Sequence, residues 1–226
     1  MAARKSDPTT AKDQGKALVV LALHGYGQTN DDLARPLKRL LKAPAGHRPA
    51  TIVYPTAPVA LDPPPGRAWW RRPTMRLDDA FVYQEFDQTW DAIKEALGGR
   101  SVDAVVGFSQ GAVLATLLLQ SGAVPGCERV VLFGASGVQD PGLSRLAPVG
   151  PHVRALIGHG TKDTLCTEED VHRLAAVYTV PPTRLAHRWG HVVPSDATSR
   201  DAVVSFLWPT REETTADGRG LGRASA

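Results

Sequence analysis

The sequence is poor in cysteine and contains no long apolar run. Only two cysteines, Cys127 and Cys166, occur among 226 residues, too few for the disulfide framework of a small secreted domain. Residues 1–16 lack the apolar core of a secretory signal peptide. No apolar run approaches the roughly 20 residues that a membrane-spanning helix needs. We therefore expect a cytoplasmic protein with reduced thiols and no membrane span.

The sequence also lacks blocks of like charge. Lysine and arginine number 26 against 23 acidic residues, which gives a formal net charge of +3, and the basic residues are scattered where a nucleic-acid-binding surface would gather them. The seven histidines are dispersed, and neither an H-E-x-x-H segment nor the Cys/His spacing of a zinc site occurs. We therefore expect no nucleic acid as a partner, no metal and no cofactor.

What the sequence does contain is a regular alternation of apolar runs of strand length with helical patterns. The apolar runs are continuous, as is typical of strands buried on both faces of a sheet. The expected strands are 17–23, 50–55, 102–108, 129–135, 153–160 and 183–189, and the expected helices are 30–42, 83–97, 109–121, 166–179 and 195–208. This alternation predicts an α/β fold in which a mostly parallel sheet of about six strands has helices on both faces.

The length suits one folded domain. Residues 17–208 are expected to form it, because the polar segments 1–16 and 209–226 are poor in large apolar side chains and read as flexible tails. Between the fourth and fifth expected strands the chain has fewer than about twenty residues, rich in glycine and proline. This predicts that no large lid covers the functional groups, which in such a fold gather beyond the carboxyl ends of the strands.

The stretch VVGFSQGAVL, residues 105–114, places Ser109 between two glycines at the junction of an expected strand and helix. Gly107 to Gly111 fit the pattern G-x-S-x-G, the nucleophile elbow, in which a tight turn holds the serine hydroxyl above the sheet at the start of a helix. The helix N-terminus there favours negative charge. A glycine-rich turn with an incidental serine is the alternative interpretation.

A serine is a weak nucleophile until a base takes its proton, and the base needs an orienting carboxylate. Asp163 follows the expected strand 153–160, and His191 follows the expected strand 183–189, so both could reach the serine from loops. His187 is a rival base, but it lies within the strand pattern. The alternatives are a turn or cap role for Asp163 and a solvent-facing position for His191.

An oxyanion hole would complete the site, because charge on the reacting carbonyl oxygen needs two N–H donors. The backbone N–H of Gln110, directly after the serine, is one candidate. The loop after the first strand, LALHGYGQTN, offers the backbone N–H of Tyr26 as the second. We expect His24 to order this loop through hydrogen bonds.

The chain resembles a serine hydrolase of the α/β-hydrolase superfamily, most closely the FSH family. The resemblance rests on LALHGYGQT at 21–29, RAWWRR at 67–72, VVGFSQGAVLATLL at 105–118, GTKDTL at 160–165 and HRWGHVVP at 187–194. It implies an α/β-hydrolase fold, Ser109 as nucleophile, Asp163 as acid and His191 as base, and hydrolysis of carboxylic esters or thioesters. Trp189 is a departure, because the family often has a small residue in the histidine loop, and this alters the expected pocket beside the base.

Substrate contacts are predicted less sharply. Trp69 and Trp70 could line an acyl or alcohol pocket, together with His24 and Trp189, while Arg71 or Arg72 attracts an anionic group; alternatively, the indoles cover the core and the arginines are solvated. The expected partner is a small-molecule ester or thioester, and the sequence gives no indication of oligomeric state. Acyl transfer to another acceptor, or ligand binding without catalysis, are the alternative functions.

Overall fold

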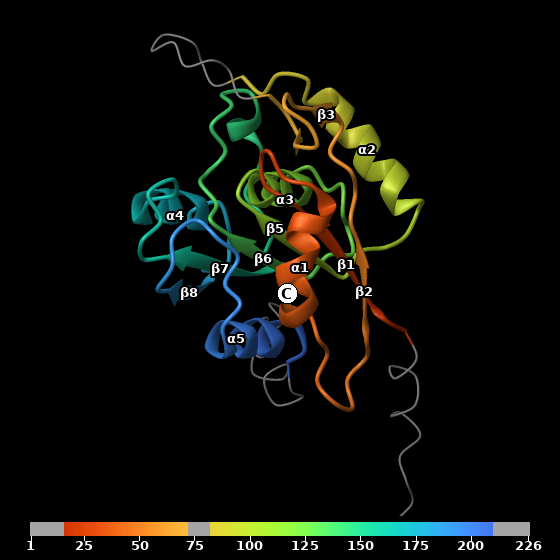
Figure 1. The fold of residues 1–226 in the computed structure, drawn as a ribbon, viewed down its shortest axis with the longest axis vertical. Coiled ribbons are helices and arrows are strands. Elements are labelled where there is room, and N and C mark those ends of the chain that lie inside the picture. Colours follow the sequence, from red (N-terminus) through yellow and green to blue (C-terminus); the bar gives the residue numbers. More distant parts are fainter. Residues whose placement is uncertain (1–15, 72–81, 210–226) are drawn as a thin grey trace, which may run out of the picture.

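A parallel sheet of six strands forms the centre of the computed structural model, which describes residues 16–71 and 82–209 (Figure 1). The strand order is β2-β1-β5-β6-β7-β8 and every neighbouring pair is parallel. The strands are β1 (Leu18–Leu23), β2 (Ala50–Val53), β5 (Ala104–Phe108), β6 (Arg129–Phe133), β7 (Arg154–Gly160) and β8 (Thr183–His187). The expected sheet is thus confirmed, and β5, buried at every position, lies at its middle.

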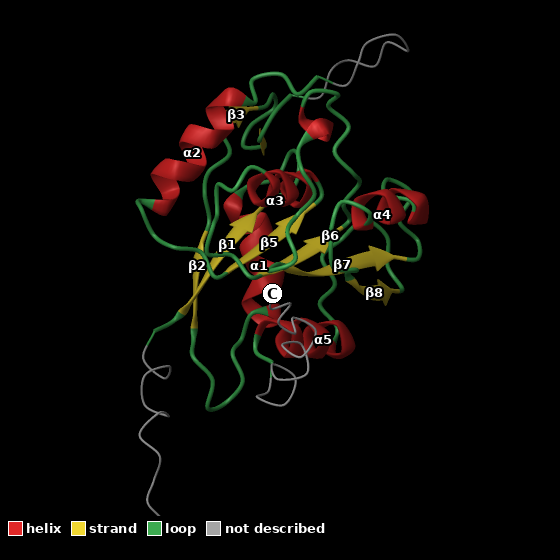
Figure 2. Cartoon of the chain, turned by 180° about the vertical axis from the view of Figure 1, so that it is seen from behind, coloured by secondary structure: helices red, strands yellow, loops and turns green. Residues whose placement is uncertain are grey.

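Helices cover both faces of the sheet, as expected (Figure 2). The helices are α1 (Asn30–Leu40), α2 (Asp87–Leu97), α3 (Gln110–Gln120), α4 (Glu168–Ala175) and α5 (Ala197–Leu207). Buried residues of α1 and α5 share one apolar cluster with one face of the sheet. Those of α2, α3 and α4 share a second cluster with the other face. Burial of these apolar side chains on both faces supplies the main driving force for folding.

Two parts of the structure differ from the expected elements. Helix α2 begins at Asp87 and not at residue 83, because Glu85 has a positive φ of 62°, which a right-handed helix cannot include. A small antiparallel pair, β3 (Val59–Ala60) and β4 (Arg67–Ala68), was not expected, because two-residue strands leave no periodic pattern in the sequence. Residues 1–15 and 210–226, nearly all of the two expected tails, and Arg72 lie outside the described residues.

Because all six strands are parallel, their carboxyl ends meet at one edge of the sheet. The loops after β1, β5, β7 and β8 therefore all emerge at this edge of the sheet. Between β6 and β7 the chain forms only a short 3₁₀ helix, Leu143–Arg145, so no large lid occupies that connection. Among the described residues, no helix is long and apolar enough to cross a membrane.

Candidate active site

Ser109 stands at the sharp turn between β5 and α3, with φ 52° and ψ −118°. A non-glycine residue pays of order 1–3 kcal/mol for such a backbone conformation. The turn is held by two hydrogen bonds: the Ser109 N–H donates to the Phe133 carbonyl at 2.9 Å, and the Ser109 carbonyl accepts from the Ala112 N–H at 2.9 Å. The hydroxyl is thereby presented at the carboxyl edge of the sheet.

The glycines on either side of Ser109 are required by close approach of the backbone. A Cβ atom on Gly107 would lie 2.5 Å from Cα of Ala112, inside the first turn of α3. A Cβ atom on Gly111 would run into the carbonyl group of Leu23 at the end of β1. The pattern G-x-S-x-G is thus a packing requirement of this strand, turn and helix, and an incidental serine in a loose glycine-rich turn does not describe it.

Three side chains from different loops form one chain of hydrogen bonds. The Ser109 Oγ lies 2.9 Å from Nε2 of His191, and Nδ1 of His191 lies 2.8 Å from Oδ2 of Asp163. The Asp163 side chain is 1% exposed and that of His191 is 20% exposed. This arrangement can move a proton from the hydroxyl to the imidazole while a buried carboxylate faces the opposite nitrogen.

The carboxylate of Asp163 is held in place by its own loop. Its Oδ1 accepts hydrogen bonds from the N–H groups of Leu165 and Cys166, each at 2.9 Å. Burial alone would raise the pKa of the Asp163 carboxyl, but the Cys166 N–H, the His191 ring and the Leu165 N–H together hold that pKa below its ordinary value. Asp163 is therefore ionised at neutral pH, and Nδ1 of His191 carries the proton that it accepts.

The His191 ring also packs closely against neighbouring residues. The ring of Phe108 lies against the His191 ring, with centroids 5.0 Å apart. Gly134, directly after β6, has a positive φ of 56°, and a Cβ atom there would lie 2.9 Å from Cε1 of His191. Sequence reasoning gave neither residue a role, because Phe108 fills a variable position of G-x-S-x-G, Gly134 belongs to no motif, and only the folded structure reveals their contacts with His191.

The rival candidates lie elsewhere. His187 is buried on β8, its ring centroid 5.8 Å from that of Trp189, and burial lowers its pKa; no hydrogen bond links it to Ser109. Glu168 and Glu169 are close enough to Asp163 in sequence to be alternative carboxylates, but both are exposed on α4, where Glu169 pairs with Arg173 at 2.8 Å. The structure thus brings His191 and Asp163 to the serine and leaves these alternatives apart from it.

The two predicted oxyanion donors belong to segments that lie next to Ser109. Gln110 is the first residue of α3, so its N–H has no acceptor within the helix. The loop carrying Tyr26 passes close to the nucleophile, because a Cβ atom on Gly25 would lie 3.2 Å from Cβ of Ser109. Nδ1 of the buried His24 lies 2.8 Å from the Gly25 carbonyl, and burial lowers the pKa of His24, so a neutral ring orders this loop.

The two tryptophans predicted as pocket residues lie in the core. Trp69 is fully buried, with its ring 5.1 Å from that of His24, and Trp70 stacks on Tyr83 at 4.3 Å between ring centroids. Their burial favours the alternative that the indoles cover the core. Arg71 Nε lies 2.6 Å from Oε2 of Glu85, so its charge has a protein partner.

Trp189 is partly buried in the histidine loop, under the guanidinium of Arg188 at 5.0 Å. Three exposed apolar side chains stand in the loops that form the site: Tyr26, Leu165 and Val192. Leu165 is 72% exposed and Val192 is 45% exposed, and they lie two residues after Asp163 and one after His191. The loops that carry Asp163 and His191 therefore each expose an apolar side chain to solvent.

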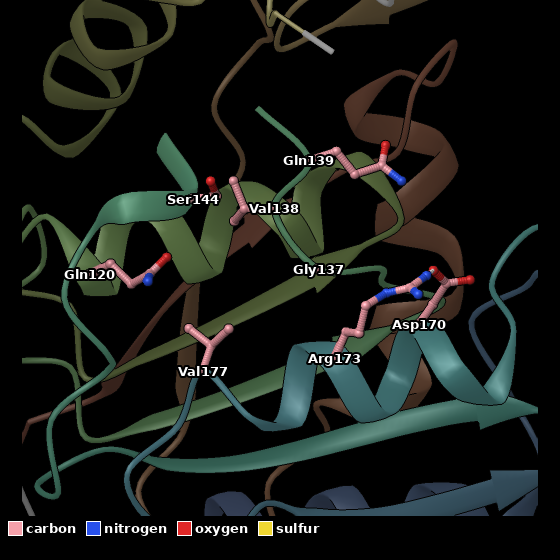
Figure 3. A pocket seen from close by; sticks show the side chains of 8 residues that line it. All are labelled: Gln120, Gly137, Val138, Gln139, Ser144, Asp170, Arg173 and Val177. Carbon is pink, nitrogen blue, oxygen red and sulfur yellow. Dashed lines mark hydrogen bonds and ion pairs between the residues drawn. The ribbon is translucent and has the colours of Figure 1, made fainter. Parts of the chain in front are cut away.

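A separate small hollow of about 140 Å³ lies between α3, α4 and the segment after β6 (Figure 3). Its lining contains none of the three hydrogen-bonded residues: it comprises Gln120, Gly137, Val138, Gln139, Ser144, Asp170, Arg173 and Val177. The Arg173 guanidinium beside this hollow is paired with Asp170 at 2.5 Å.

Other chemistries find little support in the site. Burial raises the pKa of the Cys166 thiol to about 12, and its Sγ donates to the Ala135 carbonyl at 3.0 Å, so this cysteine is a protonated packing residue and a poor nucleophile. Within residues 16–71 and 82–209, no group of three or more His, Cys, Asp or Glu side chains is placed to hold a metal ion.

Comparisons with known proteins agree with this geometry. Residues 14–203 match the family described as "Serine hydrolase (FSH1)". Esterase AAEL000016 of Aedes aegypti is 27% identical over 225 residues, which cover 90% of this chain and 80% of that protein. Esterase C25G4.2 of Caenorhabditis elegans is 25% identical over 207 residues, covering 84% and 92%. The structure of a carboxylesterase from Mesorhizobium loti has a TM-score of 0.63 at 19% identity, covering 87% of this chain and 91% of that one.

Proposed function

The chain belongs to the FSH1 family of serine hydrolases and has an α/β-hydrolase fold, and from that premise we propose that it cleaves carboxylic ester or thioester bonds of small molecules through an acyl-enzyme on Ser109. The observation that carries the proposal is the continuous hydrogen-bonded chain from Ser109 Oγ through His191 to Asp163, at 2.9 and 2.8 Å. Each member fills a role that nucleophilic catalysis at a carbonyl requires.

In the first half of the reaction, Nε2 of His191 takes the proton of the Ser109 hydroxyl as Oγ attacks the carbonyl carbon. The C=O bond opens to a tetrahedral oxyanion. When the oxyanion collapses, the bond to the leaving oxygen or sulfur breaks, and His191 returns its proton to that atom. The alcohol or thiol departs, and the acyl group remains on Ser109 as an ester.

In the second half, water repeats the sequence. His191 takes a proton from the water as its oxygen attacks the acyl carbon, and a second oxyanion collapses with return of the proton to Ser109 Oγ. The carboxylic acid leaves and the free serine is restored. Asp163 stays ionised throughout, in line with its lowered pKa, and stabilises the imidazolium that forms twice in each turnover.

We assign the stabilisation of both oxyanions to the backbone N–H groups of Gln110 and Tyr26. Gln110 adds the positive end of the α3 dipole, since it is the first residue of that helix. Donors that are already in place when charge develops contribute more than donors that must reorganise, and one such donor is worth about 10²–10³ in kcat. The exposed apolar side chains of Tyr26, Leu165 and Val192 in the surrounding loops suit contact with the hydrocarbon part of an organic ester.

Two alternatives share the same geometry. Acyl transfer would use the same acyl-enzyme with an acceptor other than water, and a ligand-binding protein would use the pocket without turnover. The intact hydrogen-bonded chain favours catalysis over binding alone.

A cytoplasmic location, which the two free and buried cysteines suit, would supply water-soluble esters and thioesters.

A panel of p-nitrophenyl esters and acyl thioesters of graded chain length tests the proposal, with the wild type and Ser109→Ala compared on each. We expect turnover by the wild type on at least one class and its loss in Ser109→Ala with an unchanged melting temperature. Adding an alcohol acceptor to the same assays separates hydrolysis from transfer, because a transferase forms the new ester. Equal turnover by both proteins would contradict the role of Ser109.

A further inference from the structure

The residue after the nucleophile, Gln110, has a buried side chain whose two polar atoms both bond to one distant segment of backbone. Its Oε1 accepts from the Trp69 N–H at 3.0 Å, and its Nε2 donates to the Trp70 carbonyl at 2.8 Å. Both bonds are buried. The amide therefore fixes the start of α3 against residues 69 and 70.

The same segment holds the loop after β1 at three points. The Trp69 indole N–H donates to the His24 carbonyl at 2.8 Å. The Gly27 N–H donates to the Arg67 carbonyl at 2.9 Å, and the Arg67 N–H donates to the Gln28 carbonyl at 3.2 Å. The anchored residues His24 and Gly27 lie on either side of Tyr26.

Residues 67–70 are themselves held by a hydrogen bond from α2 and by burial of the Trp69 ring. The Thr89 hydroxyl on α2 donates to the Trp69 carbonyl, and the Trp69 ring is fully buried against the ring of His24. The backbone just before this segment also lies close to the loop after β1, since a Cβ atom on Gly66 would lie 2.9 Å from the Gly27 carbonyl oxygen. Residues 67–70 thus form a rigid bridge between the loop and α3.

We infer that the Gln110 side chain, acting through Trp69, is a positioning device that sets the two oxyanion donors relative to each other. One donor is the backbone N–H of Gln110 itself, and the other is the N–H of Tyr26 in the loop that the bridge anchors. This inference rests on the proposed function, because it gives the donors a reaction to serve.

The physical reason is the narrow tolerance of oxyanion stabilisation. A displacement of about 1 Å costs on the order of 10²-fold in rate, and donors stabilise the transition state only when they are already aimed at the developing charge. Removal of the Gln110 amide would leave a buried N–H and a buried carbonyl without partners, so the bridge would shift to find new ones.

The effect differs from simple destabilisation in what it changes. Misplaced donors lose interactions made in the transition state, so kcat falls while KM stays near its original value.

Helix α3 offers a matched control at its other end. Gln120, the last residue of α3, also donates through Nε2 to backbone carbonyls of a loop, those of Leu146 at 3.4 Å and Ala147 at 3.1 Å, and it lines the separate hollow of Figure 3.

The test compares Gln110→Met with Gln120→Met, because methionine keeps the volume of glutamine and removes its hydrogen bonds. We expect kcat to fall about 10- to 100-fold in Gln110→Met, with KM changed less than about threefold, and kcat to stay within about twofold in Gln120→Met. Affinity for a trifluoromethyl ketone, which binds serine hydrolases as a tetrahedral oxyanion, should fall in parallel with kcat.

A second pair of variants covers the link through the indole and remains available if Gln110→Met does not fold. Trp69→Phe removes the N–H bond to His24, and we expect a loss of kcat without a matching change of KM. Trp208→Phe is the control, because it removes a comparable bond from a buried indole, that of Trp208 to the Arg48 carbonyl at 2.9 Å, outside the bridge, and it should keep kcat within about twofold.

The inference is overturned if kcat of Gln110→Met or Trp69→Phe stays within about twofold of the wild type, or falls no more than in its control at an equal loss of melting temperature. Failure of the proposed function is a different result: Ser109→Ala would then match the wild type on every substrate, whatever Gln110→Met does.

Discussion

At the scale of single residues, two histidines near the carboxyl edge of the sheet differ in what their rings reach. Nε2 of His191 faces the Ser109 hydroxyl at 2.9 Å, whereas Nδ1 of the buried His187 has no hydrogen-bond partner among residues 16–71 and 82–209. We expect His191→Gln to lower kcat by about 10⁴-fold or more, since the serine loses its base, and His187→Gln to retain it within a few-fold. Steady-state kinetics on one p-nitrophenyl ester measures both. Activity in His191→Gln with its loss in His187→Gln would reassign the base.

In the proposed mechanism, Asp163 orients the imidazole without taking its proton. Asp163→Asn keeps the size of the side chain but offers an amide that favours the wrong tautomer of His191, and we expect kcat to fall on the order of 10⁴-fold, as in the serine proteases. Glu168→Gln and Glu169→Gln, on the exposed face of α4, are the controls and should keep near-normal turnover. Collapse in either control, with Asp163→Asn near normal, would refute this assignment.

The residues of the site were predictable where their signal is local. Ser109 is the centre of the five-residue pattern G-x-S-x-G. Asp163 and His191 each follow a strand that the sequence shows as an apolar run. The Gln110 amide was not predictable, because its partners Trp69 and Trp70 are 41 and 40 positions away. The sequence left open whether the two indoles line a pocket or cover the core for the same reason, because a tryptophan beside arginines has the same local pattern in both settings.

At the scale of elements, the turn from β5 to α3 depends on the absence of a side chain at Gly111. We expect Gly111→Ala to destabilise the fold by about 3 kcal/mol or more, because the new methyl group meets the rigid backbone at Leu23. Gly137→Ala is the control, since its Cβ atom would meet only ordinary contacts, 3.7 Å from Cβ of Arg173, and should change stability by less than about 0.5 kcal/mol. Urea unfolding measures both, and equal stabilities would contradict the packing account.

The strands of the sheet and the helices that cover it could be predicted from the sequence, because six apolar runs and five helical patterns alternate along it. The ends of the predicted elements were less accurate. The positive φ of Glu85, for example, makes α2 begin at Asp87 and not at residue 83. The small β3–β4 pair escaped, since its stability comes from backbone contacts such as Gly27 to Arg67 and not from any periodic burial. Strand β4 of this pair belongs to the bridge behind the loop that carries Tyr26, so the least predictable element supports the predicted site.

At the scale of the whole molecule, two buried histidines couple stability to pH. Burial lowers the pKa of His24 and of His187, although Asp196 and Asp163 act in the opposite direction on His187. Between these lowered values and about 6.5, the ordinary value for histidine, the unfolded chain binds protons that the folded protein does not. The free energy of unfolding must therefore fall as the pH is lowered through this window.

The carboxylates with lowered pKa values, among them Asp163 and Asp170, contribute stability that is lost only as the pH falls below about 4. A comparison between pH 7.5 and pH 5.5 therefore isolates the histidines. We expect the melting temperature of the wild type to drop more over this range than that of His187→Gln, which carries one titrating histidine fewer. Parallel curves for the two proteins would show that His187 does not couple to folding.

The central claim is that Ser109 is the nucleophile, activated by His191 and Asp163. Its most direct test is reaction of the full chain with a fluorophosphonate, followed by intact mass and by fragmentation of the tryptic peptide 101–129, which contains Ser101, Ser109 and Ser121. We expect a single adduct on Ser109 in the wild type, none in Ser109→Ala, and strongly slowed labelling in His191→Gln, because only a serine beside its base attacks the phosphorus. An adduct on any other residue, or equal labelling of Ser109→Ala, would contradict the account.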